Sequence, residues 1–448
     1  MAKPDVVRVG EGAGTSRSWI EPAVELARRG QLDYLCLECL AERTVAFAQL
    51  ARLANPNAGY DPYLDRRMRL LLQPCWQNRT RILTSAGAAN PQAAGERVVR
   101  IARELGLRGL RVGIVTGDDV LSLLQPDRLF MAETGKPLQD IASQIVSANA
   151  YLGADPMVAA LEEDAHVVVA GRVADPSLAL ASLRHTFSWK ADDWNRLASG
   201  ILVGHLTECG PQVTGGYFAD PGRKEVPDLA NIGAPIAECR ADGTAVITKL
   251  PDTGGRVTPA TCTEQMLYEV HDPGGYLTPD VTADFSQVQF ALDGRDRVAV
   301  SGASGRARPG TLKVTVGYRD GFVGETQLSY GGIGCLNRGR LAADMLQKRL
   351  DKEGLHLLDS RIDLVGVNSL YKEALPPPIE PPEVRVRLVA HVNSREEADY
   401  VAGLADGLTL GGPYGGGGPS MSVREVIAVC SVFLPRENVR PKVTMMEV

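Results

Sequence analysis

The first 200 residues alternate between short strand patterns and helix patterns, and this alternation constrains the fold more than any other feature of the chain. Residues 6–9 form a valine-rich run that ends at a glycine-rich turn, and residues 18–29 carry apolar side chains at helical spacing. Further strands are predicted at 33–37, 81–85, 112–115, 144–147 and 166–170, with helices at 41–53 and 91–105. Because strands that alternate with helices form βαβ units, the sequence predicts an α/β fold with a mostly parallel, Rossmann-like sheet flanked by helices.

The pattern changes after about residue 280, where strand patterns begin to follow one another directly. These strands are predicted at 298–300, 312–316, 326–330, 361–367 and 384–392, with helices at 336–350 and 394–405. We therefore expect an α/β core domain over residues 1–284, which carries the active site, and an α+β C-terminal domain over residues 285–448. A ferredoxin-like arrangement is one form that such a domain takes. Prolines at 376–378 and 381–382 predict a stiff linker inside it.

Charge and aromatic content argue against some classes of partner. The formal net charge is -6 at pH 7, and aromatic residues make up 5% of the chain. A mildly acidic surface with few aromatic rings is unsuited to binding a phosphate backbone or stacking bases, so we expect no nucleic acid partner. No apolar run approaches the roughly 20 residues that span a bilayer, and the N-terminal residues lack a signal-peptide pattern. Eight scattered cysteines indicate reduced thiols, and together these features favour a cytoplasmic protein with no membrane contact.

Three glycines follow the first predicted strand. Gly10, Gly12 and Gly14 stand between that strand and the first helix, where glycines let the backbone approach an anion. The dinucleotide-binding fingerprint needs a further glycine five residues after the first, and that position is Thr15. The three glycines are therefore candidates for cofactor or phosphate binding, and a tight strand–helix turn is an equal alternative.

Two later strand ends also carry polar residues. Asn90 precedes Pro91 at the start of a predicted helix, so it either caps that helix or faces a ligand at the end of its strand. Asp118 and Asp119 follow the next strand. Two adjacent carboxylates at a strand end suit metal binding or proton abstraction, and capping of the following segment is at least as good an interpretation.

Arg172 and Asp175 follow the strand predicted at 166–170. Arginine presents a planar, bidentate donor that suits a carboxylate or a phosphate. The alternative is a structural ion pair between the two side chains. We favour a functional role because both residues lie at the carboxyl end of a predicted parallel strand, where α/β proteins place ligands.

The strongest local cluster is formed by His205, Glu208 and Cys209. If the helix predicted from residue 192 continues, the spacings i, i+3 and i+4 place these three side chains on one helical face. Histidine is the side chain best suited to proton transfer near neutral pH, so His205 is the leading catalytic candidate, with Glu208 orienting it. Such spacing is not diagnostic of a metal site, and a helical histidine is more often structural. We predict no resident metal.

Several of these segments together resemble the acyclic terpene utilisation AtuA family. The resemblance rests on residues 10–14, 33–35 with Glu38, 41–42, 84–91, 171–175, 204–209, 214–216 and 276–280. It implies a part in the catabolism of branched acyl-CoA intermediates, by lyase or hydratase chemistry on a 3-hydroxyacyl-CoA. Coenzyme A would then enter as part of the substrate. Some relatives carry a Ser-Gly-Asp-Lys-Gly motif in an additional small C-terminal domain, and that motif is absent from this sequence.

Three functions follow as hypotheses. The first is a catabolic lyase or hydratase for a small carboxylate or branched acyl-CoA, in which His205 moves a proton and Arg172 holds a carboxylate or thioester oxygen. The second is a metal-assisted hydrolase that uses Asp118 or Asp119 with His205 and Glu208. The third is a noncatalytic subunit that binds acyl-CoA or a nucleotide. The expected partners are the small-molecule or acyl-CoA substrate and further copies of the chain in a homo-oligomer.

Overall fold

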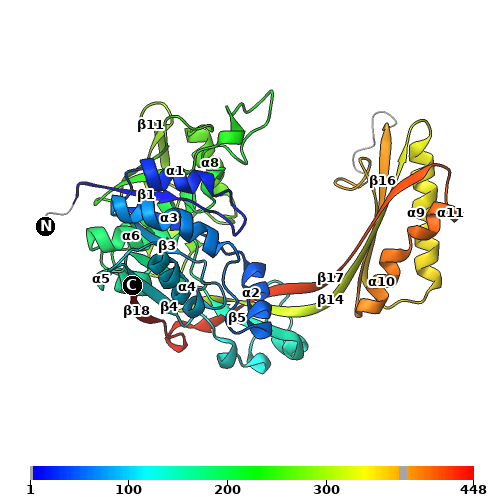
Figure 1. The fold of residues 1–448 in the computed structure, drawn as a ribbon, viewed down its shortest axis with the longest axis horizontal. Coiled ribbons are helices and arrows are strands. Elements are labelled where there is room, and N and C mark those ends of the chain that lie inside the picture. Colours follow the sequence, from blue (N-terminus) through cyan, green and yellow to red (C-terminus); the bar gives the residue numbers. More distant parts are fainter. Residues whose placement is uncertain (1–3, 373–380) are drawn as a thin grey trace. The chain divides into compact units, whose positions relative to one another are not determined.

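The computed structural model describes residues 4–372 and 381–448 (Figure 1). The chain divides into two compact units, of which unit 1 comprises Met1–Gly317 with Val429–Val448 and unit 2 comprises Tyr318–Ala428. These bounds differ from the domain boundary expected at residue 285. Of the linker predicted from proline content, residues 375–379 lie outside the described residues.

Unit 1 is built on a ten-stranded mixed sheet whose centre is parallel. Its order is β11-β12-β8-β7-β1-β2-β3-β6-β4-β18, and neighbours from β1 to β4 in this order pair in parallel. The bounds of the parallel strands are Val6–Glu11 (β1), Tyr34–Leu37 (β2), Arg81–Thr84 (β3), Arg111–Thr116 (β4) and Val167–Ala170 (β6). The α/β prediction is confirmed at this level. The order differs from the 3-2-1-4-5-6 of a Rossmann fold, because β1 pairs with the antiparallel β7 on one side and β6 lies between β3 and β4.

Helices cover both faces of this parallel centre. In β2, Leu35 and Leu37 belong to the same buried cluster as α1, α3 and α4, whereas the Tyr34 hydroxyl lies 2.7 Å from His185 Nδ1 in α6. Successive strand residues point to opposite faces, so α6 lies across the sheet from the other three helices. The bounds of these four helices are Glu21–Arg29 (α1), Leu64–Asn78 (α3), Pro91–Glu104 (α4) and Ser177–Phe187 (α6). Two further helices of unit 1 are Asp155–Glu162 (α5) and Trp194–Thr207 (α7).

This arrangement creates a divergence point at the carboxyl ends of β3 and β6. The chain leaves β3 toward α4 on one face and leaves β6 toward α6 on the other. Ligands of open α/β sheets bind where two neighbouring strands send their connections to opposite faces. The fold therefore directs attention to the segments that follow β3 and β6, together with those after β1 and β2.

Antiparallel strands extend the sheet on both sides. They are Pro235–Arg240 (β7), Ala245–Lys249 (β8), Gln289–Leu292 (β11), Arg297–Ser301 (β12) and Lys442–Glu447 (β18). Because β12 pairs with β8 and β11 pairs with β12, residues expected in the C-terminal domain lie in unit 1. Other elements of unit 1 are Glu42–Ala54 (α2), Pro259–Leu267 (α8), Ile145–Ala150 (β5), Tyr276–Leu277 (β9), Thr282–Asp284 (β10) and Ser304–Arg306 (β13).

Unit 2 is built on a five-stranded sheet in which four strands follow the order β15-β16-β14-β17 and β5 also pairs with β14. The first residues of β14 and the last residues of β17 belong to unit 1. The alternating residues Val384, Val386 and Leu388 of β16 are buried in one apolar cluster with residues of α9 and α10. The bounds are Thr311–Gly331 (β14), Cys335–Lys352 (α9), Leu357–Val365 (β15), Glu383–Val392 (β16), Arg395–Gly403 (α10), Asp406–Gly411 (α11) and Gly416–Pro435 (β17). Along unit 2 the elements follow one another as a strand, a helix, two strands, two helices and a strand.

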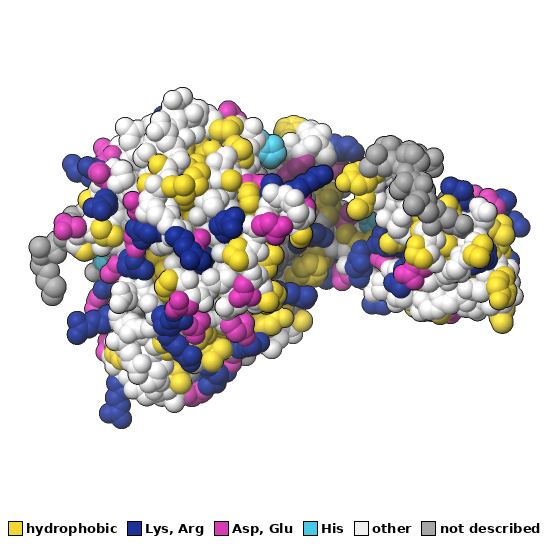
Figure 2. Space-filling model, turned by 90° about the horizontal axis from the view of Figure 1, so that it is seen from above, with side chains coloured by type: hydrophobic (Ala, Val, Ile, Leu, Met, Phe, Trp, Pro, Cys, Tyr) yellow, Lys and Arg dark blue, Asp and Glu magenta, His cyan; other side chains and the backbone are white. Residues whose placement is uncertain are grey.

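The surface carries charges of both signs. Figure 2 shows Lys and Arg side chains interspersed with Asp and Glu on the visible face of each unit. In the part of the chain that the structure describes, no helix combines the length and the apolar character needed to cross a membrane.

Candidate active site at the carboxyl ends of the parallel strands

The site begins with two buried carboxyl groups at the ends of neighbouring strands. Glu11 ends β1, and its Oε1 accepts a hydrogen bond of 2.9 Å from the backbone N–H of Glu38, just after β2. Glu38 Oε1 accepts from the Leu40 N–H at 2.8 Å. Burial raises the pKa of both carboxyl groups well above the ordinary value. Both side chains are therefore driven toward their neutral, protonated form.

Arg172, which follows β6, lies at the centre of the site and is 1% exposed. Its Nη2 donates to Asp175 Oδ1 at 2.7 Å, and its Nη1 donates to the Leu40 carbonyl at 3.0 Å. Its guanidinium carbon lies 4.1 Å from the centre of the Tyr151 ring. Nε is buried without a hydrogen-bond partner. Two donors of Arg172 thus hold neighbouring groups of the protein, one on Asp175 and one on the Leu40 carbonyl.

Asp175 is the accessible carboxylate of this group. Its side chain is 35% exposed, although acidic groups surround it. The pKa of Asp175 is raised to about 7: burial is the largest cause, the charges of Glu208 and Glu42 act in the same direction, and the Arg172 charge opposes them. A carboxyl group with this pKa is present in both protonation states near neutral pH. It can therefore accept or donate a proton.

A second network extends the site on the side of Tyr151. The Tyr151 hydroxyl donates to Glu42 Oε1 at 2.7 Å, and Lys313 Nζ lies 4.9 Å from the centre of the same ring. Burial acts to raise the pKa of Glu42, but the Tyr151 hydrogen bond and the charges of Arg172 and Lys313 outweigh it and hold that pKa at about 2. Glu42 and Lys313 also line a hollow of about 420 Å³. The charged network thus reaches an open part of the surface.

His205 lies in the last turn of α7 and has both ring nitrogens occupied. Nδ1 lies 2.8 Å from Glu208 Oε1, and Nε2 donates to the Met266 carbonyl at 3.2 Å. Burial acts to lower the pKa of His205, but the Glu208 carboxylate and the Met266 carbonyl outweigh it and raise that pKa. The other Glu208 oxygen is buried without a partner. The geometry thus leaves no free ring nitrogen on His205 to receive a substrate proton.

Aromatic packing adds Tyr276 to this cluster. The rings of Tyr276 and His205 have centres 5.3 Å apart, and the Tyr276 and Phe285 ring centres are 5.4 Å apart. Burial raises the pKa of the Tyr276 hydroxyl, and the charges of Glu208 and Asp175 raise it further. This phenol stays protonated near neutral pH and belongs to the same electrostatic neighbourhood as Asp175.

Gly10 lies within β1 and Gly12 and Gly14 follow it, and all three glycines serve close packing. A side chain at Gly12 would meet Ala23 in α1, and one at Gly14 would place its Cβ 2.5 Å from the Cys209 carbonyl carbon. Helix α1 begins only at Glu21, so the glycine turn and the helix N-terminus are separated in the chain. The turn lies against the end of α7, as expected for residues at one edge of the sheet, and its packing favours the structural interpretation.

The remaining candidates are held in structural roles. Asn90 caps α4 by accepting from the Ala93 N–H at 3.3 Å, and its amide donates to two backbone carbonyls. Asp118 is buried and accepts from the Arg172 N–H at 2.9 Å, whereas Asp119 lies 3.6 Å from Arg52. Among residues 4–372 and 381–448, no group of three or more His, Cys, Asp and Glu side chains is placed to hold a metal ion.

The comparison with known protein families covers nearly the whole chain. The model of the acyclic terpene utilisation family protein AtuA matches residues 7–445. The chain belongs to the AtuA family. The resemblance seen in separate sequence segments is thereby confirmed, and the family name implies a catabolic role. No curated protein matches the chain.

The structure of this AtuA-family chain also brings forward residues that sequence reasoning did not select for the site. These are Glu11, Tyr151, Tyr276 and Lys313. Glu11 carried a usable signal, because an acidic residue between two glycines at the end of a parallel strand lies at the same edge of the sheet as Arg172. Tyr151 and Lys313 had none, since they come from β5's end and from β14, and only the tertiary fold places them around Arg172.

Proposed function

We propose that the chain is a catabolic enzyme that performs lyase or hydratase chemistry by proton transfer at Asp175, on a small carboxylate or branched acyl-CoA. The observation that carries this proposal is the state of Asp175. Its carboxyl group is accessible, has a pKa of about 7 and is held by Arg172 over 2.7 Å. Accessible carboxyl groups with a pKa near the working pH are typical of catalytic acids and bases.

The chemistry requires one proton to leave carbon and one to reach oxygen. In the elimination direction, the Asp175 carboxylate takes the proton from the carbon next to the substrate carbonyl. The carbon–oxygen bond of the 3-hydroxyl group breaks, a carbon–carbon double bond forms, and the protonated Asp175 supplies its proton to the departing hydroxide, which leaves as water. Hydration is the reverse of these steps.

Neighbouring groups support this role of Asp175. Arg172 acts as a positioning residue, because its Nη2 fixes the carboxylate and its positive charge limits the rise in pKa. The raised pKa values of Glu11 and Glu38 favour neutral forms, which keep the site from accumulating negative charge. His205 was the leading catalytic candidate from sequence, but its two occupied nitrogens support a role in holding Glu208.

The first experiment identifies a substrate and then tests Asp175. Branched 3-hydroxyacyl-CoA thioesters and their free acids are screened by thermal shift, since a ligand that binds the folded state raises its melting temperature. Compounds that bind are then incubated with the wild type and with Asp175→Asn, and products are analysed by mass spectrometry for the loss or gain of water or for carbon–carbon cleavage.

We expect Asp175→Asn to bind the same compound with turnover reduced by ~10²–10⁴-fold, the usual contribution of general acid–base catalysis. Wild-type turnover in the variant would contradict the proposal. Tight binding of an acyl-CoA with no chemical change in the wild type would instead support a noncatalytic binding subunit.

A further inference from the structure

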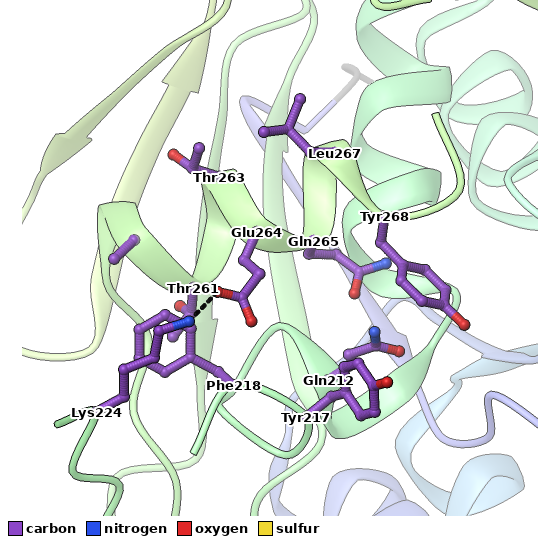
Figure 3. A pocket seen from close by; sticks show the side chains of 11 residues that line it. Gln212, Tyr217, Phe218, Lys224, Thr261, Thr263, Glu264, Gln265, Leu267 and Tyr268 are labelled. Carbon is purple, nitrogen blue, oxygen red and sulfur yellow. Dashed lines mark hydrogen bonds and ion pairs between the residues drawn. The ribbon is translucent and has the colours of Figure 1, made fainter. Parts of the chain in front are cut away.

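A hollow of about 660 Å³ lies beside α8, and none of the residues that line it takes part in the proton transfer proposed above. It is bounded by α8 and by the segment that follows the His205–Cys209 turn, as Figure 3 shows. Its volume falls within the range of small-molecule sites in proteins. The residues that line it are Gln212, Tyr217, Phe218, Lys224, Gln265 and Tyr268, with parts of α8.

Three aromatic rings line this hollow, those of Tyr217, Phe218 and Tyr268, and its two charged side chains form an ion pair with each other. The Tyr217 and Tyr268 rings meet edge to face with their centres 6.2 Å apart. Lys224 is the cation among the lining residues, and its Nζ lies 2.5 Å from Glu264 and 4.5 Å from the centre of the Phe218 ring. Because the lysine charge is already balanced, the hollow suits an uncharged, apolar ligand group better than a phosphate or a carboxylate.

Gln265 provides the polar feature of the hollow. Its side-chain amide donates from Nε2 to the His205 carbonyl at 3.0 Å, and this bond fixes which end of the amide is oxygen. Its Oε1 is buried and has no hydrogen-bond partner, and Figure 3 shows this end of the amide turned toward Gln212. Buried amide oxygens are nearly always satisfied, so a donor group of a ligand is expected at this position.

Hydrogen bonds join α8, which lines the hollow, to the end of α7, which borders the candidate active site. Gln265 holds the backbone of His205, and the adjacent Met266 carbonyl accepts from the His205 ring. The same turn of α7 supplies Glu208, whose charge acts on Asp175. A substrate whose reacting carbon lies at Asp175 therefore has an apolar hollow within the same part of the fold.

We propose that this hollow binds an uncharged, largely apolar chain of the substrate that carries one N–H or O–H donor for Gln265 Oε1. This inference rests on the proposed function for the position of the reacting end. Two sources share the required chemistry: a hydroxylated acyl chain, and the amide-containing pantetheine arm of an acyl thioester.

Titration calorimetry on the full chain tests the inference with three probes: 3-hydroxydecanoic acid, decanoic acid and pantetheine. Tighter binding of the hydroxy acid than of decanoic acid identifies the acyl chain as the occupant, and binding of pantetheine identifies the thioester arm. Tyr217→Ala, which removes an aromatic wall, should weaken the binding probe about tenfold. The matched control Tyr414→Ala changes an exposed tyrosine of unit 2 and should leave binding unchanged.

Gln265→Leu separates recognition from structure. We expect Gln265→Leu to remove only the tighter binding of the donor-bearing probe. Equal weakening of the binding of all probes would contradict recognition by Oε1. No binding of either donor-bearing probe, or equal effects of Tyr217→Ala and Tyr414→Ala, would overturn the proposal. The two proposals fail separately: if Asp175→Asn keeps full turnover while binding still depends on Tyr217, the hollow stands and the proposed chemistry falls.

Discussion

Asp175 accepts a hydrogen bond of 2.7 Å from Arg172, and the two side chains differ sharply in exposure. The guanidinium is buried, whereas about a third of the carboxylate side chain can be reached by solvent. An accessible acid fixed by a buried cation combines a defined geometry with the ability to exchange a proton.

The first prediction concerns the pH dependence of turnover. The pKa of Asp175 is raised to about 7, so the carboxylate form is lost as the pH falls through that value. If the carboxylate is the base, kcat/KM should be constant above about pH 8 and should fall tenfold per pH unit well below 7. Initial rates between pH 5 and 9 measure this. A flat profile across pH 7 would contradict the assignment of Asp175 as the base.

The second prediction concerns Arg172. The Arg172 charge opposes the rise in the pKa of Asp175, and lysine keeps a charge but cannot reproduce the two-point geometry of the guanidinium. Arg172→Lys should therefore lower kcat and move the acidic limb of the pH profile to higher pH. Arg196→Lys, at an exposed ion pair with Asp193, is the matched control and should leave the profile unchanged. A reduced rate with no shift of the limb would indicate a merely structural role.

The third prediction concerns the stability contributed by His205. Its pKa is raised in the folded protein, so its contribution is fully present below the unfolded pKa of about 6.5 and is lost as the pH rises through the folded value. His205→Gln should thus lower the free energy of unfolding by about 3 kcal/mol at pH 6. The decrease should be smaller at pH 9. Denaturant titrations measure the difference, with His271→Gln at an exposed position as control.

The same His205→Gln variant separates structure from catalysis. Turnover per folded molecule should be affected far less than in Asp175→Asn. A loss of ~10²–10⁴-fold in His205→Gln with unchanged stability would instead restore His205 as the proton-transfer group.

The fourth prediction concerns Glu11. Burial raises its pKa in the folded state, so the stability of the protein should decrease as the pH rises from the unfolded value near 4.3 toward the folded one. Glu11→Gln keeps an oxygen for the Glu38 N–H but cannot ionise. Its stability relative to the wild type should therefore be higher at pH 8 than at pH 5. Thermal unfolding at both pH values tests this, and a difference of the opposite sign would show that Glu11 is ionised in the native protein.

The fifth prediction concerns Gly14. A Cβ at this position would lie 2.5 Å from the Cys209 carbonyl carbon, so the glycine turn and the end of α7 would have to separate. Gly14→Ala should lower stability by about 1–3 kcal/mol, as overpacking usually does. Gly310→Ala is the control, since nothing lies within 4 Å of its Cβ. Equal stability of the two variants would show that the close contact does not constrain the turn.

The sequence by itself determined the fold class at the level of α/β and predicted some residues of the candidate site. Buried strand patterns alternating with helical spacing are local signals, and they were enough to predict an α/β unit with a parallel centre. Arg172, Asp175 and Glu208 were also predictable as candidates, because each follows a strand or ends a helix whose position the pattern indicates. The family resemblance depended on the same local segments and was confirmed over residues 7–445.

Only the tertiary structure decided the strand order, the division into units and the roles within the site. Insertion of β6 between β3 and β4, and addition of β11 and β12 to the large sheet, depend on pairing between segments far apart in the chain. The sequence favoured His205 over Asp175 as the proton-transfer group, yet the Met266 carbonyl occupies the remaining His205 nitrogen while Asp175 stays accessible. A side chain can transfer a proton only if a hydrogen-bonding position is unoccupied and if burial and nearby charges give it a suitable pKa. Contacts between segments far apart in the chain set all of these properties.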